Sequence, residues 1–389
     1  MKKKIAILGS TGSIGKSTVD IIKKNKNDFD VIFLSTNNNV NLLYSQSINL
    51  KASSVIIFNK KKFLKHKNKF AKKKIKVFNS FIDLKKNIIK NKIDYVMCAI
   101  SGIAGLDSTI GSISITKNIA IANKESIICA WNLIEKKLIK NKTKFIPVDS
   151  EHFSIWSLLK NESINSVEKV IITASGGPFL NYKLSRLKNV KPEQAIKHPN
   201  WSMGKKISID SATLMNKVFE IIEAQRIFKI DIKKFEIFIH PKSYIHSLVK
   251  FINGQIKILA HDTDMKIPIF NSIYQKNIKK INTKKINMNL LNNLNLKKVD
   301  LSKYPSLKIL KKINNNNTLF ETVLISANDE LVDLYIKNKI KFLEINKNLN
   351  KIINYKKYSK LIKKKPKNVS DIINLSEEVR LKTKNLCIE

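Results

Sequence analysis

The fold of this chain is decided by the stretch Ile5-Ala-Ile-Leu-Gly9-Ser-Thr-Gly12-Ser-Ile-Gly15-Lys-Ser-Thr18, which joins an apolar run to an amphipathic one through three glycines. A strand that passes through such a turn into a helix is typical of a dinucleotide-binding βαβ unit. Gly9 permits the tight turn, Gly12 lets the backbone approach a pyrophosphate, and Gly15 lets the helix pack closely on the strand. The spacing is G-x-x-G-x-x-G rather than G-x-G-x-x-G, and the rest of a P-loop is missing. We predict a cofactor-binding turn, the alternative being a structural turn that binds nothing.

Outward from this turn, short apolar runs alternate with amphipathic stretches as far as residue 148. The runs lie at residues 5–8, 31–34, 54–58, 95–100, 119–122 and 145–148. Strands that alternate with helices form βαβ units and a parallel sheet. The sequence therefore predicts an α/β protein in which residues 1–148 form a Rossmann-like, doubly wound parallel sheet that binds the nucleotide.

The rest of the chain divides by composition. Residues 149–277 carry motif-rich loops and short apolar runs at 170–173, 235–239 and 247–252, which predicts a central α+β catalytic domain. Residues 278–302 are polar and rich in Lys and Asn, as expected of a linker. Residues 303–389 show helical periodicity that breaks at the asparagine run 314–317 and at Pro366, so we predict a small C-terminal helical bundle.

The formal net charge of +43 ordinarily indicates a nucleic-acid or membrane surface. The lysines occur all along the chain beside Asn and Ile, however, which is typical of an AT-biased genome rather than of one basic face. No apolar run approaches the roughly twenty residues that span a bilayer, and the run at 5–8 is too short for a signal peptide. Three cysteines without metal-ligand spacing suit a reducing compartment. We expect a cytoplasmic protein with no membrane partner and no specific nucleic-acid partner.

The loop after the second strand bears on the choice of nucleotide. NAD sites commonly end this strand with an acid that binds the ribose hydroxyls. Here the apolar run at 31–34 leads into Ser35-Thr36-Asn37-Asn38-Asn39, which contains no acid. A carboxylate would repel a 2′-phosphate, whereas this uncharged loop tolerates one, so the sequence favours NADP over NAD.

Three carboxylates indicate a divalent metal site. Asp149 and Glu151 lie two residues apart where a strand ends and a helix begins, and Glu220 belongs to a later helix. Three carboxylates with open positions suit Mg²⁺ or Mn²⁺, and no Cys/His set competes for zinc. The alternative is a helix cap, with Asp149 and Ser150 at the N-terminus and Glu151 in the first turn.

Donors for a phosphate lie in the same part of the chain. Asn216 and Glu220 are four residues apart and share a helix face, with Lys217 beside them. The turn Ser175-Gly-Gly-Pro178 follows a strand and, in this interpretation, forms a phosphate cradle together with Ser211. Taken alone, such a tetrapeptide is more often only a turn.

A loop that contains His198, Pro199, Trp201 and Gly204 comes before this helix. We predict that it closes over the substrate and excludes water. Trp201 could instead be an ordinary core residue, because tryptophan is commonly buried. The whole segment indicates an active site for a phosphorylated substrate and a metal.

Blocks of unusual composition follow one another in order along the chain. They are Gly9-Ser-Thr-Gly-Ser-Ile-Gly15, Ala122-Asn-Lys-Glu-Ser126, Pro147-Val-Asp-Ser-Glu-His152, Ser175-Gly-Gly-Pro-Phe179, His198-Pro-Asn-Trp-Ser-Met-Gly204, Ser208-Ile-Asp-Ser-Ala-Thr213, Met215-Asn-Lys217, His240-Pro-Lys-Ser243, Ile245-His-Ser247 and Asp264-Met265. Together they closely resemble the 1-deoxy-D-xylulose 5-phosphate reductoisomerase family of the methylerythritol phosphate route to isoprenoids. The resemblance covers essentially the whole chain.

The resemblance implies a role for each matching residue. Mg²⁺, Mn²⁺ or Co²⁺ would be bound by Asp149, Glu151 and Glu220, and the catalytic residues would be these three and Lys124. The substrate would be bound by Lys124, Ser150, Glu151, Ser175, His198, Ser211, Asn216, Lys217 and Glu220. The cofactor NADPH would be bound by Thr11, Gly12, Ser13, Ile14, Asn37, Asn38, Asn39, Asn123, Lys124, Glu125, Gly204 and Met265. The mobile flap would contain His198, Pro199, Trp201 and Met203.

The resemblance also implies a reaction and an assembly. The family rearranges the carbon skeleton of 1-deoxy-D-xylulose 5-phosphate with the help of a metal, and hydride transfer from NADPH then gives 2-C-methyl-D-erythritol 4-phosphate. Its members are homodimers. Two other readings stay open: an NADP dehydrogenase of a phosphorylated sugar that needs no metal, and a basic nucleic-acid-binding protein that retains the fold.

Several blocks depart from the family pattern. Its Gly-Lys-Asn after the second strand reads Asn37-Asn38-Asn39 here, so the lysine expected at the 2′-phosphate is missing. Its Pro-Asp-Met-Arg, His-Pro-Gln-Ser and Tyr/Trp-Pro-x-Arg segments read Thr263-Asp-Met-Lys266, His240-Pro-Lys-Ser243 and Tyr274-Gln-Lys-Asn277. The last three departures concern packing or dimer contacts, and we expect them to affect stability more than chemistry.

Overall fold

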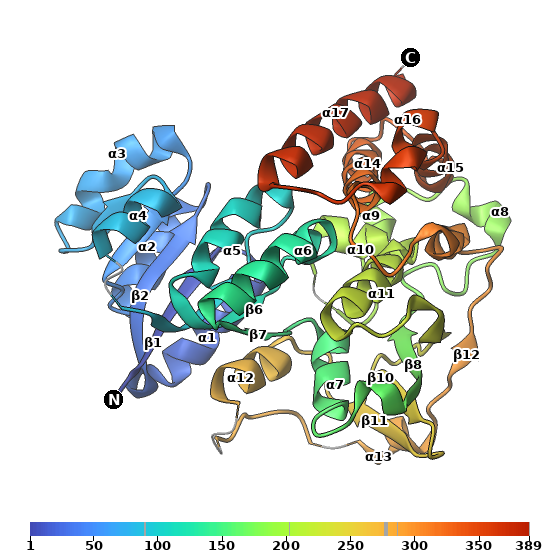
Figure 1. The fold of residues 1–389 in the computed structure, drawn as a ribbon, viewed down its shortest axis with the longest axis horizontal. Coiled ribbons are helices and arrows are strands. Elements are labelled where there is room, and N and C mark those ends of the chain that lie inside the picture. The colour runs from blue at the N-terminus through green and yellow to red at the C-terminus, as the bar shows by residue number, and fades with distance from the viewer. Residues whose placement is uncertain (89–90, 202, 276–278, 286, 389) are drawn as a thin grey trace. The chain divides into compact units, whose positions relative to one another are not determined.

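The computed structural model describes residues 1–88, 91–201, 203–275, 279–285 and 287–388, which form two compact units (Figure 1). The first unit comprises Met1–Ser126, Asn132–Asp149 and Met265–Ile281. The second unit comprises Ile127–Trp131, Ser150–Asp264 and Asn282–Glu389. Helices and strands occur in both units, and the predicted α/β class is confirmed.

The first unit is built on a seven-stranded parallel sheet in the order β4-β3-β2-β1-β5-β6-β7. Its strands are β1 (Lys3–Leu8), β2 (Phe29–Thr36), β3 (Ser54–Ile57), β4 (Lys76–Phe78), β5 (Ile93–Cys98), β6 (Thr116–Ile121) and β7 (Lys144–Ile146). They are connected by the helices α1 (Ser13–Lys24), α2 (Val40–Asn49), α3 (Lys60–Ala71), α4 (Phe81–Ile88), α5 (Leu106–Ile113) and α6 (Lys124–Asn141), with short turns η1 (Lys26–Asp28) and η2 (Ile103–Gly105). The strand order reverses between β1 and β5, the switch point at which such sheets bind ligands. The predicted doubly wound sheet is confirmed, whereas the three-residue strand β4 was not predicted.

Helix α12 (Lys266–Tyr274) belongs to the core of the first unit. Its Ile269, Phe270 and Ile273 are buried in the same cluster as the side chains of β1 and β2. The hydroxyl of Ser272 lies 2.7 Å from that of Tyr95 in β5, 177 residues away in sequence. Helix α12, which the sequence analysis assigns to the central domain of residues 149–277, and Ile281, which it assigns to the linker, therefore pack with the nucleotide fold. The apolar face of α12 does not by itself say which core it joins.

The second unit contains a mixed five-stranded sheet in the order β11-β10-β8-β9-β12. Its strands are β8 (Val167–Ala174), β9 (Phe235–Ile239), β10 (Ile245–Phe251), β11 (Ile256–Ala260) and β12 (Lys297–Lys298). The helices before and between them are α7 (Ser150–Leu158), α8 (Leu184–Leu187), α9 (Pro192–Ala195), α10 (Lys205–Ala212) and α11 (Met215–Phe228), with the turns η3 (Ile164–Ser166) and η4 (Ile232–Lys234). Strand β8 runs parallel to β9 and antiparallel to β10, and its Val170 and Ile172 pack with Ile155 of α7 and Ile221 of α11.

The segment predicted as a linker, 278–302, contains a short helix, α13 (Met288–Asn292), and the two-residue strand β12. Lys297 and Lys298 pair with Ile239 and Phe238 of β9, so this segment adds an edge strand to the sheet. Neither β11 nor β12 was predicted, because β11 is only five residues long and β12 consists of two lysines. Positions 278 and 286 of the predicted linker lie outside the described residues.

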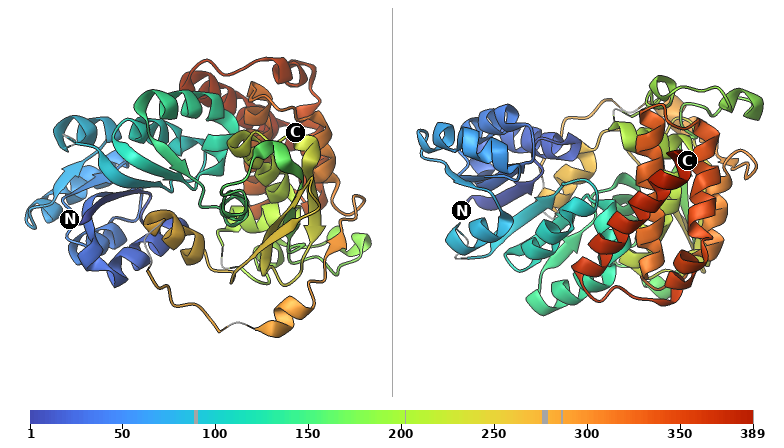
Figure 2. Two further views of the ribbon diagram at one scale, coloured as in Figure 1. Left: turned by 60° about the horizontal axis from the view of Figure 1, so that its bottom comes forward. Right: turned by 90° about the horizontal axis from the view of Figure 1, so that it is seen from above.

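Helices close the chain, as predicted (Figure 2, orange to red). They are η5 (Pro305–Lys312), α14 (Leu319–Ile336), α15 (Phe342–Ile353), α16 (Lys356–Ser359), η6 (Lys360–Lys363) and α17 (Val369–Ile388). The asparagine run 314–317 separates η5 from α14, and its carbonyls at 314 and 316 accept hydrogen bonds from Arg226 of α11. Arg226 also lies 2.5 Å from the carboxylate of Glu321, so a buried ion pair fastens these helices to α11.

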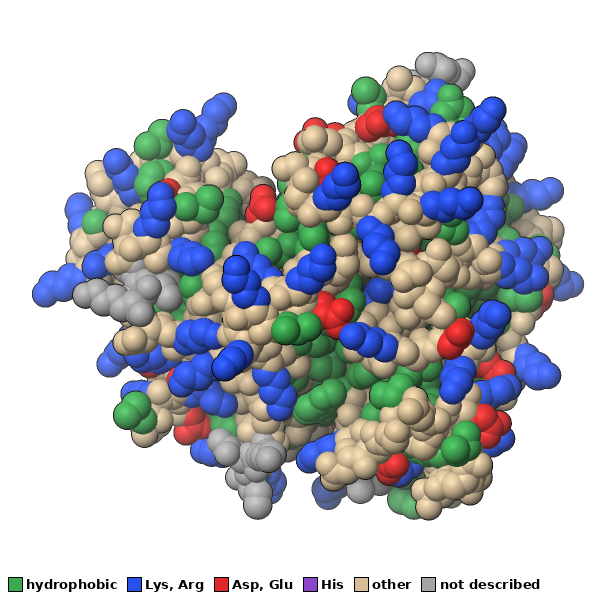
Figure 3. Space-filling model, viewed as in Figure 1, with side chains coloured by type: hydrophobic (Ala, Val, Ile, Leu, Met, Phe, Trp, Pro, Cys, Tyr) green, Lys and Arg blue, Asp and Glu red, His purple; other side chains and the backbone are tan. Residues whose placement is uncertain are grey.

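Basic side chains are spread widely over the surface. In Figure 3, Lys and Arg side chains are scattered among uncharged ones over the visible face of each unit. This distribution matches the dispersal of lysine along the sequence. Within the described ranges, no helix has the length and apolar character needed to cross a membrane.

We predict that Gly15→Ala destabilises the first unit. A Cβ at position 15 would lie 2.2 Å from the Gly9 carbonyl oxygen and 2.6 Å from Ser10 Cα, so the turn or α1 would have to shift. Overpacking of this kind typically costs about 1–3 kcal/mol, and urea unfolding would show a lower midpoint. Gly12→Ala is the matched control, because its Cβ would meet the Gly9 carbonyl oxygen at an ordinary 3.4 Å. Equal losses from both variants would contradict the packing role of Gly15.

Candidate active site

Three carboxylates meet at the start of α7. This helix begins at Ser150, so Asp149 lies just before the helix and Glu151 lies in its first turn. Glu220 belongs to α11. One carboxylate oxygen from each of Asp149, Glu151 and Glu220 lies within 4.8 Å of the others. Glu151 and Glu220 are buried, whereas Asp149 is half-buried. The donor set is entirely oxygen, as hard divalent cations prefer.

A side-chain cation already lies among these carboxylates. The ammonium of Lys217 donates to Glu151 Oε1 and, over 2.6 Å, to Glu220 Oε2, while the amide of Asn216 donates to Glu220 Oε1. Burial alone would lower the pKa of Lys217, but the two carboxylates raise it above its ordinary value. The third carboxylate has its own cation, because Lys124 Nζ lies 3.5 Å from Asp149 Oδ2. The group therefore requires compensating positive charge.

His152 and Glu223 adjoin this group and were not singled out from the sequence. Their ligand atoms form a second set with Asp149, within 4.8 Å of one another. His152 Nε2 lies 2.8 Å from the backbone carbonyl of Glu220, to which it donates, and its Nδ1 lies 3.5 Å from Glu223. The histidine thus links α7 to α11. A signal was present, since Glu223 follows Glu220 by about one helical turn.

The turn after β8 presents Ser175. Gly176 and Gly177 both have positive φ, at 84° and 68°, which side chains rarely adopt. A Cβ at Gly177 would lie 2.8 Å from Ala212 Cα and 2.9 Å from the Ser211 carbonyl oxygen, so the turn packs against the end of α10. The turn that carries Ser175 therefore contacts the backbone of Ser211, the residue predicted to share its cradle.

His198 joins the predicted flap to Ser175. Its Nδ1 accepts backbone N–H groups from Asn200 at 3.2 Å and Trp201 at 3.0 Å, so the ring proton resides on Nε2. Nε2 donates to Ser175 Oγ over 2.9 Å, and the Gly177 N–H donates to the same oxygen over 3.0 Å. Because Ser175 Oγ accepts twice, its own proton remains to be donated to a ligand.

The flap also contacts a second loop. The Asn200 amide donates to the Pro241 carbonyl over 2.6 Å and to Ser243 Oγ over 2.8 Å. The half-buried Trp201 ring meets His246 edge-on at 6.0 Å, and His246 stacks on His261 at 3.8 Å. Pro199 is exposed, Met203 is half-buried, and the exposed Gly204 caps α10. Trp201 therefore lies on a histidine pair rather than in a fully buried core.

Most of the predicted cofactor residues follow strands of the first unit, whereas Gly204 lies in the second unit. Gly12 caps α1, and Thr11 Oγ1 lies 2.7 Å from Thr36 Oγ1 at the end of β2, which ties the glycine turn to the loop 37–39. Asn123 caps α6 by accepting from the Ser126 N–H, and Lys124 and Glu125 form the first turn of that helix. Met265 packs against the core of the first unit.

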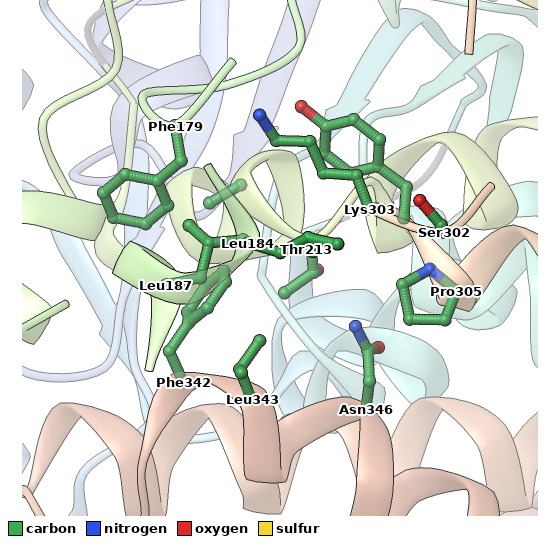
Figure 4. Close-up of a pocket in the computed structure, with 12 residues that line it drawn as sticks. Phe179, Leu184, Leu187, Thr213, Ser302, Lys303, Pro305, Phe342, Leu343 and Asn346 are labelled. Atoms are coloured by element: carbon green, nitrogen blue, oxygen red, sulfur yellow. The ribbon is translucent and has the colours of Figure 1, made fainter. Parts of the chain in front are cut away.

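A separate cavity of about 70 Å³ lies behind the Gly176 turn (Figure 4). Phe179, Leu187 and Phe342 give it an apolar wall. The hydroxyl of Tyr304, another lining residue, donates to the Gly176 carbonyl over 2.9 Å. The hydrogen bond from Tyr304 thus connects a wall of this cavity to the turn.

Comparisons with known proteins match the whole length of the chain. Family models for 1-deoxy-D-xylulose 5-phosphate reductoisomerase match residues 5–131 and, for its C-terminal domains, residues 145–228 and 261–382. The reductoisomerase of Pelagibacter ubique is 54% identical over 387 residues, which are 99% of this chain and 100% of that protein. The chain belongs to the 1-deoxy-D-xylulose 5-phosphate reductoisomerase family.

Other members of the reductoisomerase family also match the chain over nearly its full length. The enzyme of Wolbachia pipientis from Culex pipiens is 39% identical over 395 residues and covers 99% of each chain. The solved reductoisomerase of Zymomonas mobilis in complex with NADPH has a TM-score of 0.89 at 31% identity, over 100% of this chain and 99% of that one. A reductoisomerase in complex with NADPH, fosmidomycin and magnesium has a TM-score of 0.91 at 28% identity, over 98% of each chain.

We predict that this reductoisomerase loses stability as the pH falls from about 6.5 towards 4. Burial and then the charge of Lys217 lower the pKa of His198 to about 4, and burial also lowers the pKa of His240 and His261. When a pKa is lower in the folded protein than in the unfolded chain, the unfolded chain binds the proton first. The folded protein therefore keeps its full stability above the pKa that these histidines have in the unfolded chain, and it loses stability as the pH falls below that value.

Urea midpoints at about pH 7 and about pH 5 would measure this loss. The midpoint of His198→Asn should fall less than that of the unmodified chain, because asparagine does not titrate. An equal fall in both proteins would show that His198 contributes nothing to the pH dependence.

Proposed function

We propose that Asp149, Glu151 and Glu220 hold the divalent cation with which this chain performs its reaction. The chain is an NADPH-dependent reductoisomerase that converts 1-deoxy-D-xylulose 5-phosphate to 2-C-methyl-D-erythritol 4-phosphate for isoprenoid synthesis, with Mg²⁺, Mn²⁺ or Co²⁺. The observation that carries the residue assignment is the cluster of three carboxylates whose ligand atoms lie within 4.8 Å of one another, two of them paired with the Lys217 ammonium. When bound there, a divalent cation polarises substrate oxygens as a Lewis acid.

The phosphate of the substrate would be held by Ser175, Ser211, Asn216 and Lys217. The Ser175 hydroxyl has its proton free to donate, because its oxygen already accepts from His198 and Gly177. Asn216 and Lys217 share the first turns of α11 with Glu220, so one helix would present both the phosphate donors and a metal ligand. The relative solved with fosmidomycin and magnesium supports an anionic group beside a metal.

Two groups next to the carboxylates would complete the substrate site. Lys124 lies 3.5 Å from Asp149 and would reach the substrate hydroxyls. The Ser150 hydroxyl donates to Glu151 Oε2 over 2.5 Å, which orients that carboxylate. The flap with His198, Pro199, Trp201 and Met203 would close over the substrate and exclude water during the chemistry.

NADPH would bind along the carboxyl ends of the parallel strands. The backbone from Thr11 to Ile14 would hold the pyrophosphate at the start of α1, where a helix N-terminus favours an anion. The loop 37–39 after β2 would receive the ribose, Asn123, Lys124 and Glu125 after β6 would contact the cofactor, and Met265 would line the nicotinamide side. Gly204 would complete the cofactor site. The relatives solved with NADPH support this placement.

We expect Glu220→Gln and Asp149→Asn to remove most turnover while NADPH binding persists, because each removes one charged metal ligand. The assay follows NADPH absorbance with 1-deoxy-D-xylulose 5-phosphate and Mn²⁺, and NADPH affinity is titrated separately. Glu168→Gln is a control outside the site, since Glu168 pairs with Lys250 at the surface. Loss of NADPH binding in the two site variants would show that these carboxylates are placed wrongly.

The same assay separates the alternatives. A metal-free NADP dehydrogenase would keep its turnover after chelation of divalent ions, whereas the proposed enzyme would lose it and recover it with Mn²⁺. A nucleic-acid-binding protein would bind DNA tightly with a steep salt dependence and would oxidise no NADPH. Neither alternative is favoured, because the chain matches the reductoisomerases over its full length.

We propose four regions with different roles in the enzyme. Residues 1–148 would bind NADPH, residues 149–277 would supply the metal, substrate and dimer contacts, residues 278–302 would link, and residues 303–389 would form the helical bundle. The compact units divide the chain differently in two places, because Met265–Ile281 belongs to the first unit and Ile127–Trp131 to the second. We also propose that the enzyme acts in the cytoplasm.

We propose a homodimer, in which the free edge of the second unit's sheet contributes to the interface. Strand β11 is the last strand of that sheet, and its Ile256 and Ile258 are 58% and 45% exposed. An unpaired apolar edge commonly marks an association surface.

Light scattering should then give twice the mass of the chain. Ile256→Lys should shift the mass towards that of a monomer at low concentration, because it places a charge on the proposed interface. Leu381→Lys, at an exposed apolar position on α17, is the control. A monomeric unmodified chain would refute the proposal.

A further inference from the structure

The loop after β2 contains no basic residue that could bind the 2′-phosphate of NADPH. Residues 35–39 read Ser-Thr-Asn-Asn-Asn, with neither acid nor base. Sites that accept NADP ordinarily place a basic side chain near the end of this strand, where the 2′-phosphate lies. A preference for NADPH would therefore require a cation from another segment.

The structure brings such a cation to the loop from α3. Lys62 Nζ donates to the Asn38 carbonyl over 2.7 Å. The Asn59 amide lies 3.3 Å from Asn38 Oδ1, and Asn59 also caps α3 by accepting from the Lys62 N–H over 3.0 Å. Lys62 is half-buried, whereas the neighbouring Lys60 and Lys61 are exposed. The first turn of α3 is thus fastened to the loop by two contacts to one residue.

Sheet pairing explains why these distant segments meet. Strands β2 and β3 are parallel neighbours, with Thr36 opposite Ile57 at their carboxyl ends. The Phe58 N–H then donates to the Thr36 carbonyl over 3.0 Å, which extends the pairing by one residue. Whatever follows β3 must therefore lie beside whatever follows β2.

We propose that Lys62 binds the 2′-phosphate of NADPH and makes this chain prefer NADPH to NADH. An ammonium has three N–H donors, so Lys62 can keep its bond to Asn38 and direct the others at phosphate oxygens. The N-terminal end of α3 adds positive potential at the same point. The amides of Asn37 and Asn38 offer further neutral donors. This inference rests on the proposed binding of NADPH at the glycine turn.

The test compares two nucleotides that differ only in the 2′-phosphate, adenosine 2′,5′-bisphosphate and 5′-AMP, by calorimetric titration of the full chain. Lys62→Ala should weaken binding of the bisphosphate about tenfold, as expected when a charge-assisted hydrogen bond is lost. It should change the affinity for 5′-AMP less than about twofold. Lys61→Ala is the control. It removes the charge of an exposed lysine next to Lys62 and should leave both affinities unchanged.

Steady-state kinetics provide a second readout. Lys62→Ala should raise KM for NADPH and leave KM for NADH unchanged. A Lys62→Ala protein that still prefers the bisphosphate as strongly as the unmodified chain would overturn the proposal, and so would an equal effect of Lys61→Ala, which would indicate general attraction by a basic surface.

Gly12→Ala separates this inference from the proposed cofactor turn. If the turn holds the 5′-phosphate, the added methyl group weakens both nucleotides alike. Unchanged affinities in Gly12→Ala therefore count against the turn, whereas an unchanged preference in Lys62→Ala counts against Lys62 alone.

Discussion

Repulsion among carboxylates is the constraint on which the site depends. Asp149, Glu151 and Glu220 bring ligand atoms within 4.8 Å of one another, a distance at which like charges oppose each other strongly once water is excluded. Positive charge must compensate them: Lys124 pairs with Asp149, and Lys217 pairs with Glu151 and Glu220. The fold holds these charges together through helices and strands that pack around them. The Ser247 hydroxyl of β10, for example, donates to the backbone of Glu151 over 3.1 Å.

The carboxyl-terminal edge of the parallel sheet is arranged by the backbone rather than by charge. Parallel strands all end at one edge, so the turns after β1, β2, β3 and β6 gather there whatever their side chains. The Thr11–Thr36 contact and the Lys62–Asn38 contact are two results of that geometry. When the loop after one strand has no basic residue, the segment after the neighbouring strand can therefore place one at the same point without a change of fold.

A neutral histidine connects the predicted flap to the turn that carries Ser175. His198 accepts two backbone N–H groups of the flap with one nitrogen and donates to Ser175 with the other, which is possible only without a second ring proton. Burial keeps the pKa of His198 low enough for this form to prevail at neutral pH. Flap conformation and the direction of the Ser175 hydroxyl proton are therefore physically coupled.

The sequence by itself determined the doubly wound sheet, the glycine turn, the helical C-terminus and the three carboxylates, because periodicity and short motifs are local properties. The metal, phosphate and cofactor roles of individual residues remain predictions. Only the tertiary structure decided that α12 joins the first core, that His152 and Glu223 adjoin the carboxylates, and that Lys62 reaches the loop after β2. Each of these depends on contacts between segments far apart in the chain. Their amphipathic patterns and charges are compatible with several neighbours, and only the packed fold selects one.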